Sequence, residues 1–427
     1  MIAEIIAVGN ELISGSVVDT NSAFVGRQLS LFGLHVQYHT TVGDNIEDIQ
    51  WALRTASQRS DVAVICGGLG PTADDVTTEA AARCMGTDLV LDEMALDALR
   101  RRFQQIGVEM TPNNEKQARL PRGAVVMLNP WGSAAAFMIR NGRCRQFFLP
   151  GVPKELRNLL LHEVIPRLQA EIAPGVVFLN KSLRVFGLTE SKIDQMLSHI
   201  NWDTGHARLA SLPHFPEIEL KITSSGSKET EAKRALEDME NQVREVLNDY
   251  IFTTDQDTME GRVGELMRER CWTLAVAESC TGGLVGHRIT QISGSSDYFD
   301  RGLVTYSNRS KVEILGVPED ILHRYGAVSR PTALAMARGA RERSGSHVGL
   351  ATTGIAGPTG GGAEKPVGTV FIAIDTAETS VCRHYLFRGD RDRIKTITAQ
   401  TALDLLRKFL LGRLDRGTHM YEVRNSD

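Results

Sequence analysis

Cysteine is scarce in this sequence and is not arranged for metal binding. The six cysteines of the 427 residues form no C-x-x-C pair and no short cluster with histidine; they stand at positions 66, 84, 144, 271, 280 and 382. This spacing excludes the usual enclosed zinc site. We therefore expect reduced thiols in a cytoplasmic protein.

Long hydrophobic runs are also absent. No stretch of about 20 uninterrupted apolar residues occurs, as a membrane-spanning helix would require. The N-terminal run MIAEIIAVGNEL contains Glu4 and has no basic residues before its apolar ones, unlike an export signal. The sequence predicts neither membrane insertion nor export.

Charge of one sign is not in excess either. Forty-eight Lys and Arg stand against 52 Asp and Glu, for a formal net charge of -4. No strong positive field is therefore available to hold a polyanion. The densest basic run, Arg100 to Arg102, has the spacing of a solvated helix face. We expect no nucleic-acid partner.

The chain does contain enough apolar material for several cores, since 42% of its 427 residues are hydrophobic. Residues 1–172 alternate strand-like and helical patterns, which predicts an α/β/α domain on a parallel sheet. Residues 173–255 resemble a small α+β spacer module without a chemical constellation, and residues 256–412 a second α/β/α domain. Residues 413–427 form a polar tail that we expect to be mobile.

A glycine-rich segment, GGLGPTADDVT at Gly67 to Thr77, follows a predicted strand. Glycine N–H groups ahead of a helix suit phosphate or pyrophosphate, although a plain turn is the alternative. Asp74 and Asp75 are oxygen ligands for a divalent cation, or simply acids that favour a helix N-terminus. The candidate phosphate-binding residues are Gly67, Gly68, Gly70 and Thr72.

In the third segment, the run AESCTGG places Ser279 between a strand ending at Glu278 and a helix expected to begin near Thr281. Such a turn exposes a hydroxyl toward backbone donors. The alternative is that Ser279 or Thr281 only caps the helix. Cys280 is a rival nucleophile, but no histidine stands in a partner motif, so Ser279 is preferred.

A serine nucleophile needs a base, and TYSNRSK supplies Tyr306 and Lys311 after a strand expected at Leu303 to Ser307. A lysine acts as a general base only when its pKa falls toward neutrality, and an exposed, solvated lysine is the alternative. The loop TTGIAGPTGGG, from Thr352 to Gly362, offers approachable amides for an oxyanion or a phosphate, or forms a tight connection.

The N-terminal motifs GNELISGSVVDTN, VGDN, GGLGPTADDVT and LPGVPKEL resemble the N-terminal domain of the CinA family, which is related to the MoaB/MogA fold. The resemblance implies a nucleotide or pterin phosphate ligand, and hydrolysis of ADP-ribose with a divalent metal such as Mg, Mn or Co. It makes Glu11, Asp44, Asp74 and Asp75 candidate metal ligands. One departure from the family's pattern is NPWGSAAAF, where Ala135 and Ala136 replace a Pro-Gly pair. This replacement removes the glycine on which a turn at this position would depend.

The C-terminal motifs AESCTGG, GLVTYSNRSK, GAVS, TGIAGPTGG and KPVGTV resemble the CinA C-terminal domain, which includes nicotinamide mononucleotide amidohydrolase. FGLTES fits the family's linking domain. The resemblance implies a Ser279 and Lys311 dyad assisted by Tyr306, no cofactor for the amidase, and a homodimer. The implied substrate-binding residues are Thr281, Gly282, Gly283, Thr353, Gly354, Gly357 and Arg393.

These patterns predict deamidation of nicotinamide mononucleotide, with hydrolysis of ADP-ribose as a second activity. Two rival functions stay open. One is a non-enzymatic interaction protein associated with competence or DNA damage. The other is a molybdopterin-related binding protein, which leaves Ser279, Lys311 and Arg393 unexplained.

Overall fold

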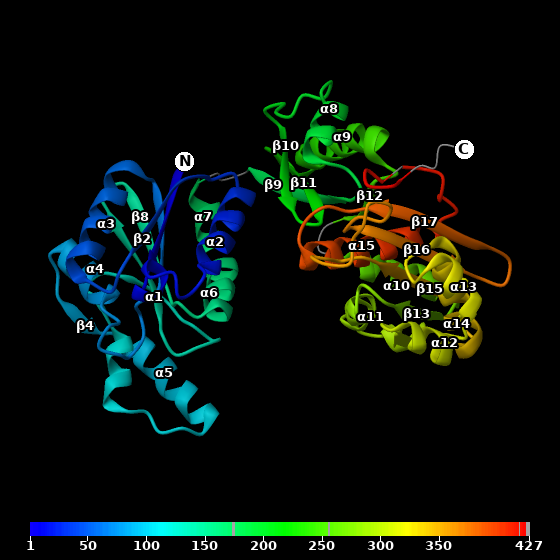
Figure 1. Ribbon diagram of the computed structural model, residues 1–427. Coiled ribbons are helices and arrows are strands. Elements are labelled where there is room, and N and C mark those ends of the chain that lie inside the picture. The colour runs from blue at the N-terminus through cyan, green and yellow to red at the C-terminus, as the bar shows by residue number, and fades with distance from the viewer. Residues whose placement is uncertain (173–175, 255–256, 418, 424–427) are drawn as a thin grey trace. The chain divides into compact units, whose positions relative to one another are not determined.

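The computed structural model describes residues 1–172, 176–254, 257–417 and 419–423, and the chain divides into two compact units (Figure 1). The first unit is Met1–Phe178 with Gly226–Glu229, and the second is Leu179–Ser225 with Thr230–Asp427. The predicted middle module and the predicted C-terminal domain therefore belong largely to one unit.

The first unit alternates strands with helices, as the pattern predicts. Its elements are β1 (Ile2–Val8), α1 (Asn10–Ile13), α2 (Thr20–Leu31), β2 (His35–Val42), α3 (Ile46–Arg59), β3 (Val62–Cys66), α4 (Thr77–Met85), β4 (Leu89–Leu91), α5 (Glu93–Ile106), the 3-10 helix η1 (Pro112–Ala118), β5 (Arg119–Pro121), β6 (Val125–Met127), β7 (Ala136–Asn141), β8 (Cys144–Leu149), α6 (Pro153–Leu159), the π-helical turn η2 (Leu160–Val164) and α7 (Ile165–Ile172).

The main sheet of this unit has the strand order β2-β1-β3-β8-β7-β6. The first four strands are parallel, but β7 is antiparallel to both of its neighbours. The prediction of a parallel sheet is therefore wrong at this edge. Only Gly142 and Arg143 separate β7 from β8, and so short a connection joins antiparallel strands.

Helices cover both faces of this sheet, so the α/β/α class is confirmed. Side chains of α3, α4 and α5 pack on one face, around Ile6, Ile65 and Phe148. Side chains of α2, α6 and α7 pack on the other face, around Ile5 and Val64. The carboxyl ends of the parallel strands are left free to carry loops, which is where ligands bind in such sheets.

The second unit begins with the middle module and continues into the C-terminal domain. Its elements are β9 (Val177–Val185), α8 (Glu190–Met196), β10 (Ala207–His214), β11 (Glu217–Gly226), α9 (Glu229–Leu247), β12 (Ile251–Thr254), α10 (Met259–Glu269), β13 (Leu274–Glu278), α11 (Leu284–Thr290), the 3-10 turn η3 (Ser295–Asp297), β14 (Phe299–Val304), α12 (Asn308–Leu315), α13 (Glu319–Tyr325), α14 (Arg330–Ser344), β15 (Val348–Gly354), β16 (Thr369–Asp375), β17 (Ser380–Leu386) and α15 (Arg391–Leu410).

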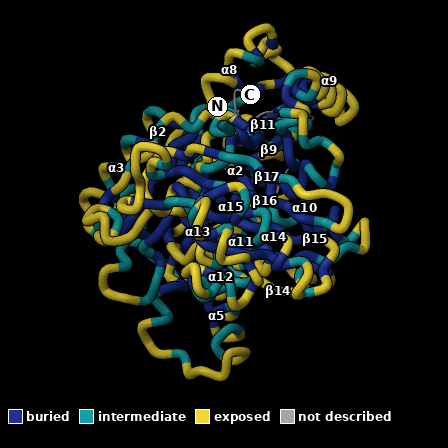
Figure 2. The backbone as a smooth tube through the Cα atoms, turned by 45° about the vertical axis from the view of Figure 1, so that its right-hand side comes forward, coloured by how far each residue is buried: buried dark blue, intermediate teal, exposed yellow. Residues whose placement is uncertain are grey.

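The middle module is a four-stranded sheet, β10-β11-β9-β12, packed against α8 and α9. Its α+β character agrees with the sequence pattern. The sequence pattern does not predict strand β10, because only two of its eight residues, Ala207 and Leu209, are buried. Figure 2 shows the outer turns of α8 and α9 in the exposed colour.

The C-terminal domain is a second three-layer structure on the sheet β14-β13-β15-β16-β17. Strands β14, β13 and β15 are parallel, and β16 and β17 are antiparallel. Helices α10, α11 and α15 pack on one face, and α12, α13 and α14 on the other. Ser279 and Lys311 both follow parallel strands that end at the same edge of this sheet.

The C-terminal tail is packed, and the expectation that it is mobile is wrong for residues 413–417 and 419–423. The His419 side chain is buried and contacts the rings of Phe186 and Tyr385, with ring centroids 4.9 and 5.6 Å away. The N–H of Leu386 donates to the carbonyl of Tyr421 at 3.0 Å, which extends the sheet beyond β17. The rings of His419 and Tyr421, in an otherwise polar segment, provide the packing.

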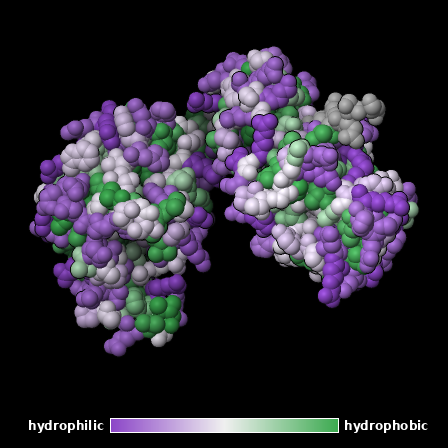
Figure 3. Space-filling view, viewed as in Figure 1, coloured by the Kyte–Doolittle hydropathy of each residue, from purple (hydrophilic) through white to green (hydrophobic). Residues whose placement is uncertain are grey.

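Hydrophilic side chains cover most of the face drawn in Figure 3. Apolar side chains gather over the C-terminal end of α5, where Ile106 and Val108 are exposed. Within the described residues, no helix combines the length and apolarity needed to cross a bilayer.

Candidate functional site

The two residues predicted to form a dyad lie in contact. The Nζ atom of Lys311 is 3.1 Å from Oγ of Ser279, within hydrogen-bonding distance, although 32 residues separate them in sequence. Ser279 is 8% exposed and Lys311 is 0% exposed. The alternative of an exposed, solvated lysine is therefore wrong.

The turn that carries Ser279 is held by the carboxylate of Glu278. That buried side chain accepts hydrogen bonds from the N–H groups of Gly283, Val285 and Gly286 at 2.8 to 3.1 Å. Helix α11 starts only at Leu284, so the expected start near Thr281 is wrong. Neither Ser279 nor Thr281 caps the helix, because the Glu278 carboxylate accepts the hydrogen bonds of the first backbone N–H groups instead. The hydroxyl of Ser279 is therefore not used as a helix cap.

Lys311 lies in the first turns of α12, after β14, which ends at Val304 rather than at the expected Ser307. Its ammonium nitrogen also donates to the carbonyl of Thr305 at 2.8 Å and to that of Tyr306 at 3.3 Å. Burial lowers the pKa of Lys311 from 10.5 to about 8. With this pKa, about a tenth of Lys311 is neutral at pH 7 and about half at pH 8, and the neutral form is what a general base requires.

Cys280, the rival nucleophile, is buried beside Ser279. Burial raises the pKa of its thiol to about 12. The reactive thiolate form is therefore disfavoured at neutral pH, and Cys280 acts as a small core residue. All six cysteines are free thiols in this structure, as expected.

Tyr306 is joined to the glycine-rich loop through Arg391, in the first turn of α15. The guanidinium donates to the hydroxyl of Tyr306 at 3.0 Å and to the carbonyl of Gly357 at 2.8 Å. The Tyr306 side chain is exposed. Arg391 therefore brings two of the predicted residues, Tyr306 and Gly357, to one place.

Arg393 lies differently, although it is only two residues further along α15. Its guanidinium stacks over the ring of Phe215, 3.9 Å from the ring centroid. Phe215 stands between β10 and β11 in the middle module. Arg393 therefore contacts the middle module, and its contact with substrate stays a prediction.

The remaining predicted residues of this site line neighbouring strand ends and turns. Thr281 and Thr352 are buried and share a hydrogen bond of 2.7 Å, and Thr353 donates to the carbonyl of Ala327 at 2.7 Å. Gly282 and Gly283 have left-handed backbones, with φ of 61° and 97°. Gly354 ends β15, where a side chain would collide with Val370.

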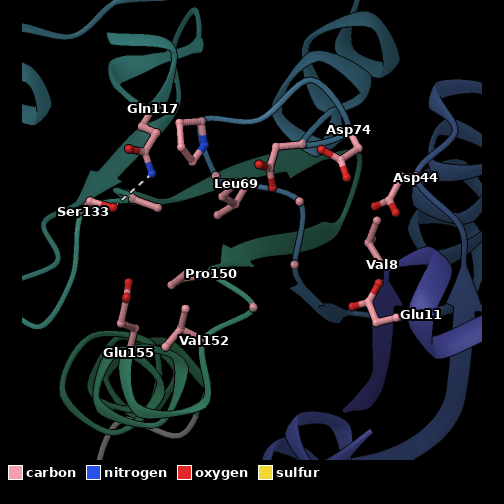
Figure 4. A pocket seen from close by; sticks show the side chains of 18 residues that line it. Val8, Glu11, Asp44, Leu69, Asp74, Gln117, Ser133, Pro150, Val152 and Glu155 are labelled. Atoms are coloured by element: carbon pink, nitrogen blue, oxygen red, sulfur yellow. Dashed lines mark hydrogen bonds between the residues drawn. The ribbon is translucent and has the colours of Figure 1, made fainter. Parts of the chain in front are cut away.

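In the first unit, the glycine-rich segment and the four predicted carboxylates line one pocket of about 380 Å³ (Figure 4). The pocket lies at the carboxyl ends of β1, β2 and β3. A Cβ atom on Gly67 would lie 2.4 Å from the carbonyl oxygen of Val8, so only glycine allows this close approach. The predicted residues on its lining are Glu11, Asp44, Gly67, Gly68, Gly70, Asp74 and Asp75.

The carboxylates of the pocket repel one another. Burial raises the pKa of Asp44 above 3.8, and the negative charges of Glu11, Asp74 and Asp75 raise it further. A cation would relieve this repulsion, and carboxylate oxygens suit Mg or Mn. Across the ranges described, however, no three His, Cys, Asp or Glu side chains are close enough to enclose an ion.

Thr72 does not line the pocket, unlike the other predicted phosphate-binding residues. Its hydroxyl instead contacts carboxylate oxygens of Asp74 and Asp75, each at 2.5 Å. The first of these contacts lowers the pKa of Asp74. Thr72 thus orients the two acids.

The alanines that replace the Pro-Gly pair cause no strain. Ala136 is the first residue of β7 and pairs with Met127, and Ala135 is buried just before it. Neither residue has a positive φ. No turn at this position depends on glycine.

Several site residues were missed from the sequence. Glu278 lies inside the motif AESCTGG but was given no role, and the run of cations at 391, 393 and 395 at the start of the last helix was the available signal for Arg391. Gln117 and Glu155 also line the N-terminal pocket; Glu155 lies within the motif LPGVPKEL, whereas no sequence signal indicated Gln117.

The fold and the sites together define a protein with two α/β/α domains, one carrying an acidic, glycine-lined pocket and the other a buried serine and lysine pair. Three family models match the chain. They are described as "Probable molybdopterin binding domain" over residues 4–170, "Damage-inducible protein CinA KH domain" over residues 180–253, and "CinA C-terminal domain" over residues 256–410.

Relatives match over nearly the whole chain. A CinA-like protein of Geotalea uraniireducens is 44% identical over 406 residues, which cover 95% of this chain and 97% of the relative. A CinA-like protein of Geobacter sulfurreducens is 45% identical over 407 residues, covering 95% and 98%. The chain belongs to the CinA family, as the sequence motifs indicated.

Solved structures match parts of the chain. CinA from Thermoplasma acidophilum is 39% identical, covering 39% of this chain and 96% of that chain, with a TM-score of 0.37. The competence/damage inducible protein from Agrobacterium tumefaciens is 43% identical, covering 35% and 91%, with a TM-score of 0.34.

Proposed function

We propose that the C-terminal domain hydrolyses the carboxamide of nicotinamide mononucleotide to nicotinic acid mononucleotide and ammonia. The observation that carries this proposal is the buried contact of 3.1 Å between Lys311 Nζ and Ser279 Oγ. A serine beside a lysine with a lowered pKa is an activated nucleophile, and acyl transfer is the chemistry that such a pair performs.

Neutral Lys311 takes the proton of Ser279 as the oxygen attacks the carboxamide carbon. The C–N bond of the resulting tetrahedral intermediate then breaks, and the Lys311 ammonium returns the proton to the leaving ammonia. An ester on Ser279 remains. Water attacks this ester, Lys311 accepts its proton and returns it to Ser279, and the acid is released.

Two features of the site fit the rest of this reaction. The left-handed turn at Gly282 and Gly283 fixes the position of Ser279, because the N–H of Gly282 donates to the carbonyl of Ser279 at 3.2 Å and that of Gly283 to the carboxylate of Glu278 at 2.9 Å. The start of α15 supplies cations for the 5'-phosphate. Arg391 contacts the glycine-rich loop. Lys395 lies near the turn that follows Ser279, since its Nζ atom is 3.9 Å from the position that a Cβ atom on Gly282 would take. Arg393 is the third cation at the start of α15.

The test is turnover of nicotinamide mononucleotide by the full chain, with ammonia and nicotinic acid mononucleotide both measured. Ser279→Ala should lower the rate about a thousandfold or more while the protein remains folded. Cys280→Ala, in the same turn, is the matched control and should keep most of the activity. Equal rates for Ser279→Ala and wild type would overturn the proposal, and a folded wild type without turnover would favour a binding protein.

The acidic pocket favours a second activity, the hydrolysis of ADP-ribose to AMP and ribose 5-phosphate. Glycine amides suit a pyrophosphate, and the family resemblance makes Glu11, Asp44, Asp74 and Asp75 the candidate ligands of a divalent cation such as Mg, Mn or Co; they line one pocket but, within the described residues, do not gather closely enough to enclose an ion by themselves. When bound, that cation would neutralise charge on the phosphates. Asp44 is held in place by Asn10, because each residue donates its backbone N–H to a side-chain oxygen of the other, at 2.9 and 3.2 Å.

We further propose that the protein acts in the cytoplasm as a homodimer on these small nucleotides, without nucleic acid. Residues 180–253 match a KH domain model but contain no G-x-x-G tetrapeptide, the loop with which KH domains clamp a nucleic-acid backbone. A molybdopterin-related role would instead require pterin binding in the acidic pocket.

A further inference from the structure

The middle module shares its packing with the C-terminal domain. Phe186, which follows β9, and Phe252, in β12, are buried in the core of that domain. The N–H of Met420, in the tail, donates to the carbonyl of Gly187 at 3.0 Å. Buried apolar contacts of this kind hold two domains in one arrangement. The module therefore has a fixed position against the domain that carries the serine and lysine pair.

A chain of polar contacts crosses this interface at Glu217, the first residue of β11. Its Oε2 atom lies 3.2 Å from the guanidinium of Arg184, and its Oε1 atom accepts a hydrogen bond from Nε2 of Gln400, in α15, at 2.9 Å. Gln400 is completely buried, and its Oε1 atom accepts from the guanidinium of Arg288, in α11. Arg288 also pairs with Glu260, in α10, at 2.7 Å. One residue of the middle module is thus connected to three helices of the C-terminal domain.

Two of these helices carry parts of the proposed amidase site. Helix α11 follows directly on the turn of Ser279, and the Glu278 carboxylate accepts from its first N–H groups. Helix α15 begins with Arg391, about 14 Å along the helix axis from Gln400 at 1.5 Å per residue. A helix moves as a rigid rod over this length. The contact between Gln400 and Arg288 therefore helps to set the distance from the start of α15 to the serine.

Phe215, at the turn between β10 and β11, makes a second contact with α15. The guanidinium of Arg393 lies over its ring, 3.9 Å from the ring centroid. Since Glu217 is only two residues further on, one hairpin contacts α15 both in its first turn and near its middle. Both contacts depend on geometry, because a buried polar network tolerates few arrangements and a cation must lie close over a ring.

We propose that Glu217 and Phe215 are positioning residues of the amidase, through which the middle module holds the cations of α15 at the distance from Ser279 that nicotinamide mononucleotide spans. The 5'-phosphate then meets these cations while the carboxamide lies at the serine, and a misplacement of about 1 Å far from the chemistry is enough to weaken such a fit. Nicotinamide riboside has the same ring and ribose but no phosphate, so it does not use this distance. This role rests on the proposed hydrolysis of nicotinamide mononucleotide.

The test is kinetics of the full chain with both substrates. Glu217→Met removes both acceptor oxygens at nearly constant volume and should raise KM for nicotinamide mononucleotide about tenfold, with kcat changed by less than about twofold. The rate constant for nicotinamide riboside, measured with excess enzyme, should stay unchanged. Phe215→Ala, at a position that is 44% exposed and tolerates truncation, should raise the same KM about threefold.

Glu219→Met is the matched control. Glu219 lies two residues further along β11, on the same face, but it contacts Ser182 and His214 of the middle module itself. This variant should leave KM for nicotinamide mononucleotide unchanged.

Three outcomes would overturn the inference. One is an unchanged KM in folded Glu217→Met and Phe215→Ala. Another is an equal loss on both substrates or in Glu219→Met, as a merely structural role would give. The third is a lower KM in Phe215→Ala, which would show that the ring withholds Arg393 from the phosphate. Failure of the proposed function is read separately, as a wild type that releases no ammonia from nicotinamide mononucleotide, and it would remove this role as well.

Discussion

The Nζ atom of Lys311 lies 3.1 Å from Oγ of Ser279, in surroundings that exclude water from the lysine almost completely. The lysine stands at the start of a helix and the serine in a turn after a strand, and the parallel strands β13 and β14 bring them together. Burial of the charged lysine lowers the stability of the folded protein, and the same burial favours the neutral form that can act as a base.

The first prediction is the pH dependence of the amidase. The general base must be neutral, and burial lowers the pKa of Lys311 to about 8. We expect kcat/KM for nicotinamide mononucleotide to rise about tenfold per pH unit below that value and to level off above it. A profile that is flat from pH 6 to pH 9 would contradict the role of Lys311.

The second prediction concerns stability. The folded state binds the Lys311 proton less tightly than the unfolded chain, whose lysine keeps a pKa near 10.5. The resulting penalty, about 3 kcal/mol, is fully present below pH 8 and disappears as the pH rises to about 10.5. Lys311→Met should therefore raise the free energy of unfolding at pH 7 by up to that amount.

Denaturant unfolding at pH 7 and at pH 10 measures this effect. The gain of Lys311→Met should shrink at the higher pH. A Lys311→Met variant that is less stable than wild type at both pH values would show that Lys311 stabilises the folded state rather than destabilising it.

The third prediction is that Glu278 positions the catalytic turn. Its carboxylate accepts three backbone N–H groups, and a glutamine amide would direct donors against some of them. Glu278→Gln should cost about 2 kcal/mol of stability and lower kcat with less effect on KM. Glu313→Gln, on the exposed side of α12, is the control, and identical behaviour of the two variants would refute the role.

The fourth prediction separates the two arginines at the start of α15. Arg391 contacts Tyr306 and Gly357, whereas Arg393 lies on Phe215. Arg391→Gln should raise KM for nicotinamide mononucleotide at least about tenfold, and Arg393→Gln by a smaller factor. The reverse order in steady-state kinetics would assign the phosphate to Arg393, as the family resemblance implied.

The fifth prediction is that the two sites are chemically independent. Asp44→Asn removes one of the four candidate ligands and eases their mutual repulsion. It should abolish ADP-ribose hydrolysis and leave ammonia release unchanged, and a chelator should have the same effect on wild type. Loss of both activities in a folded variant would contradict this independence.

The sequence predicted the parallel core strands and the residues on their loops because apolar runs and glycine-rich turns are local signals. It did not predict the antiparallel edges, since strand direction depends on the two-residue connection between β7 and β8 and on partners distant in sequence. The tail was misjudged because His419 and Tyr421 find aromatic partners only in the folded domain.

In the candidate sites, residues within motifs could be predicted from the sequence, but the contacts between them could not. Ser279 and Lys311 were identified from motifs, but their contact depends on strand order, and the burial of Lys311 depends on packing around α12. Gln117 belongs to no motif and Glu155 stands in LPGVPKEL without a predicted role; only the folding of η1 and α6 around one pocket shows that both side chains line it.

The most direct test of the central claim is ammonia release from nicotinamide mononucleotide by wild type and by Lys311→Met, at pH 8.5 and with a chelator present. We predict one ammonia and one nicotinic acid mononucleotide per substrate consumed by wild type, and a rate at least about a thousandfold lower for the folded variant. Comparable rates for the two proteins, or a wild type that releases no ammonia, would contradict a serine activated by Lys311.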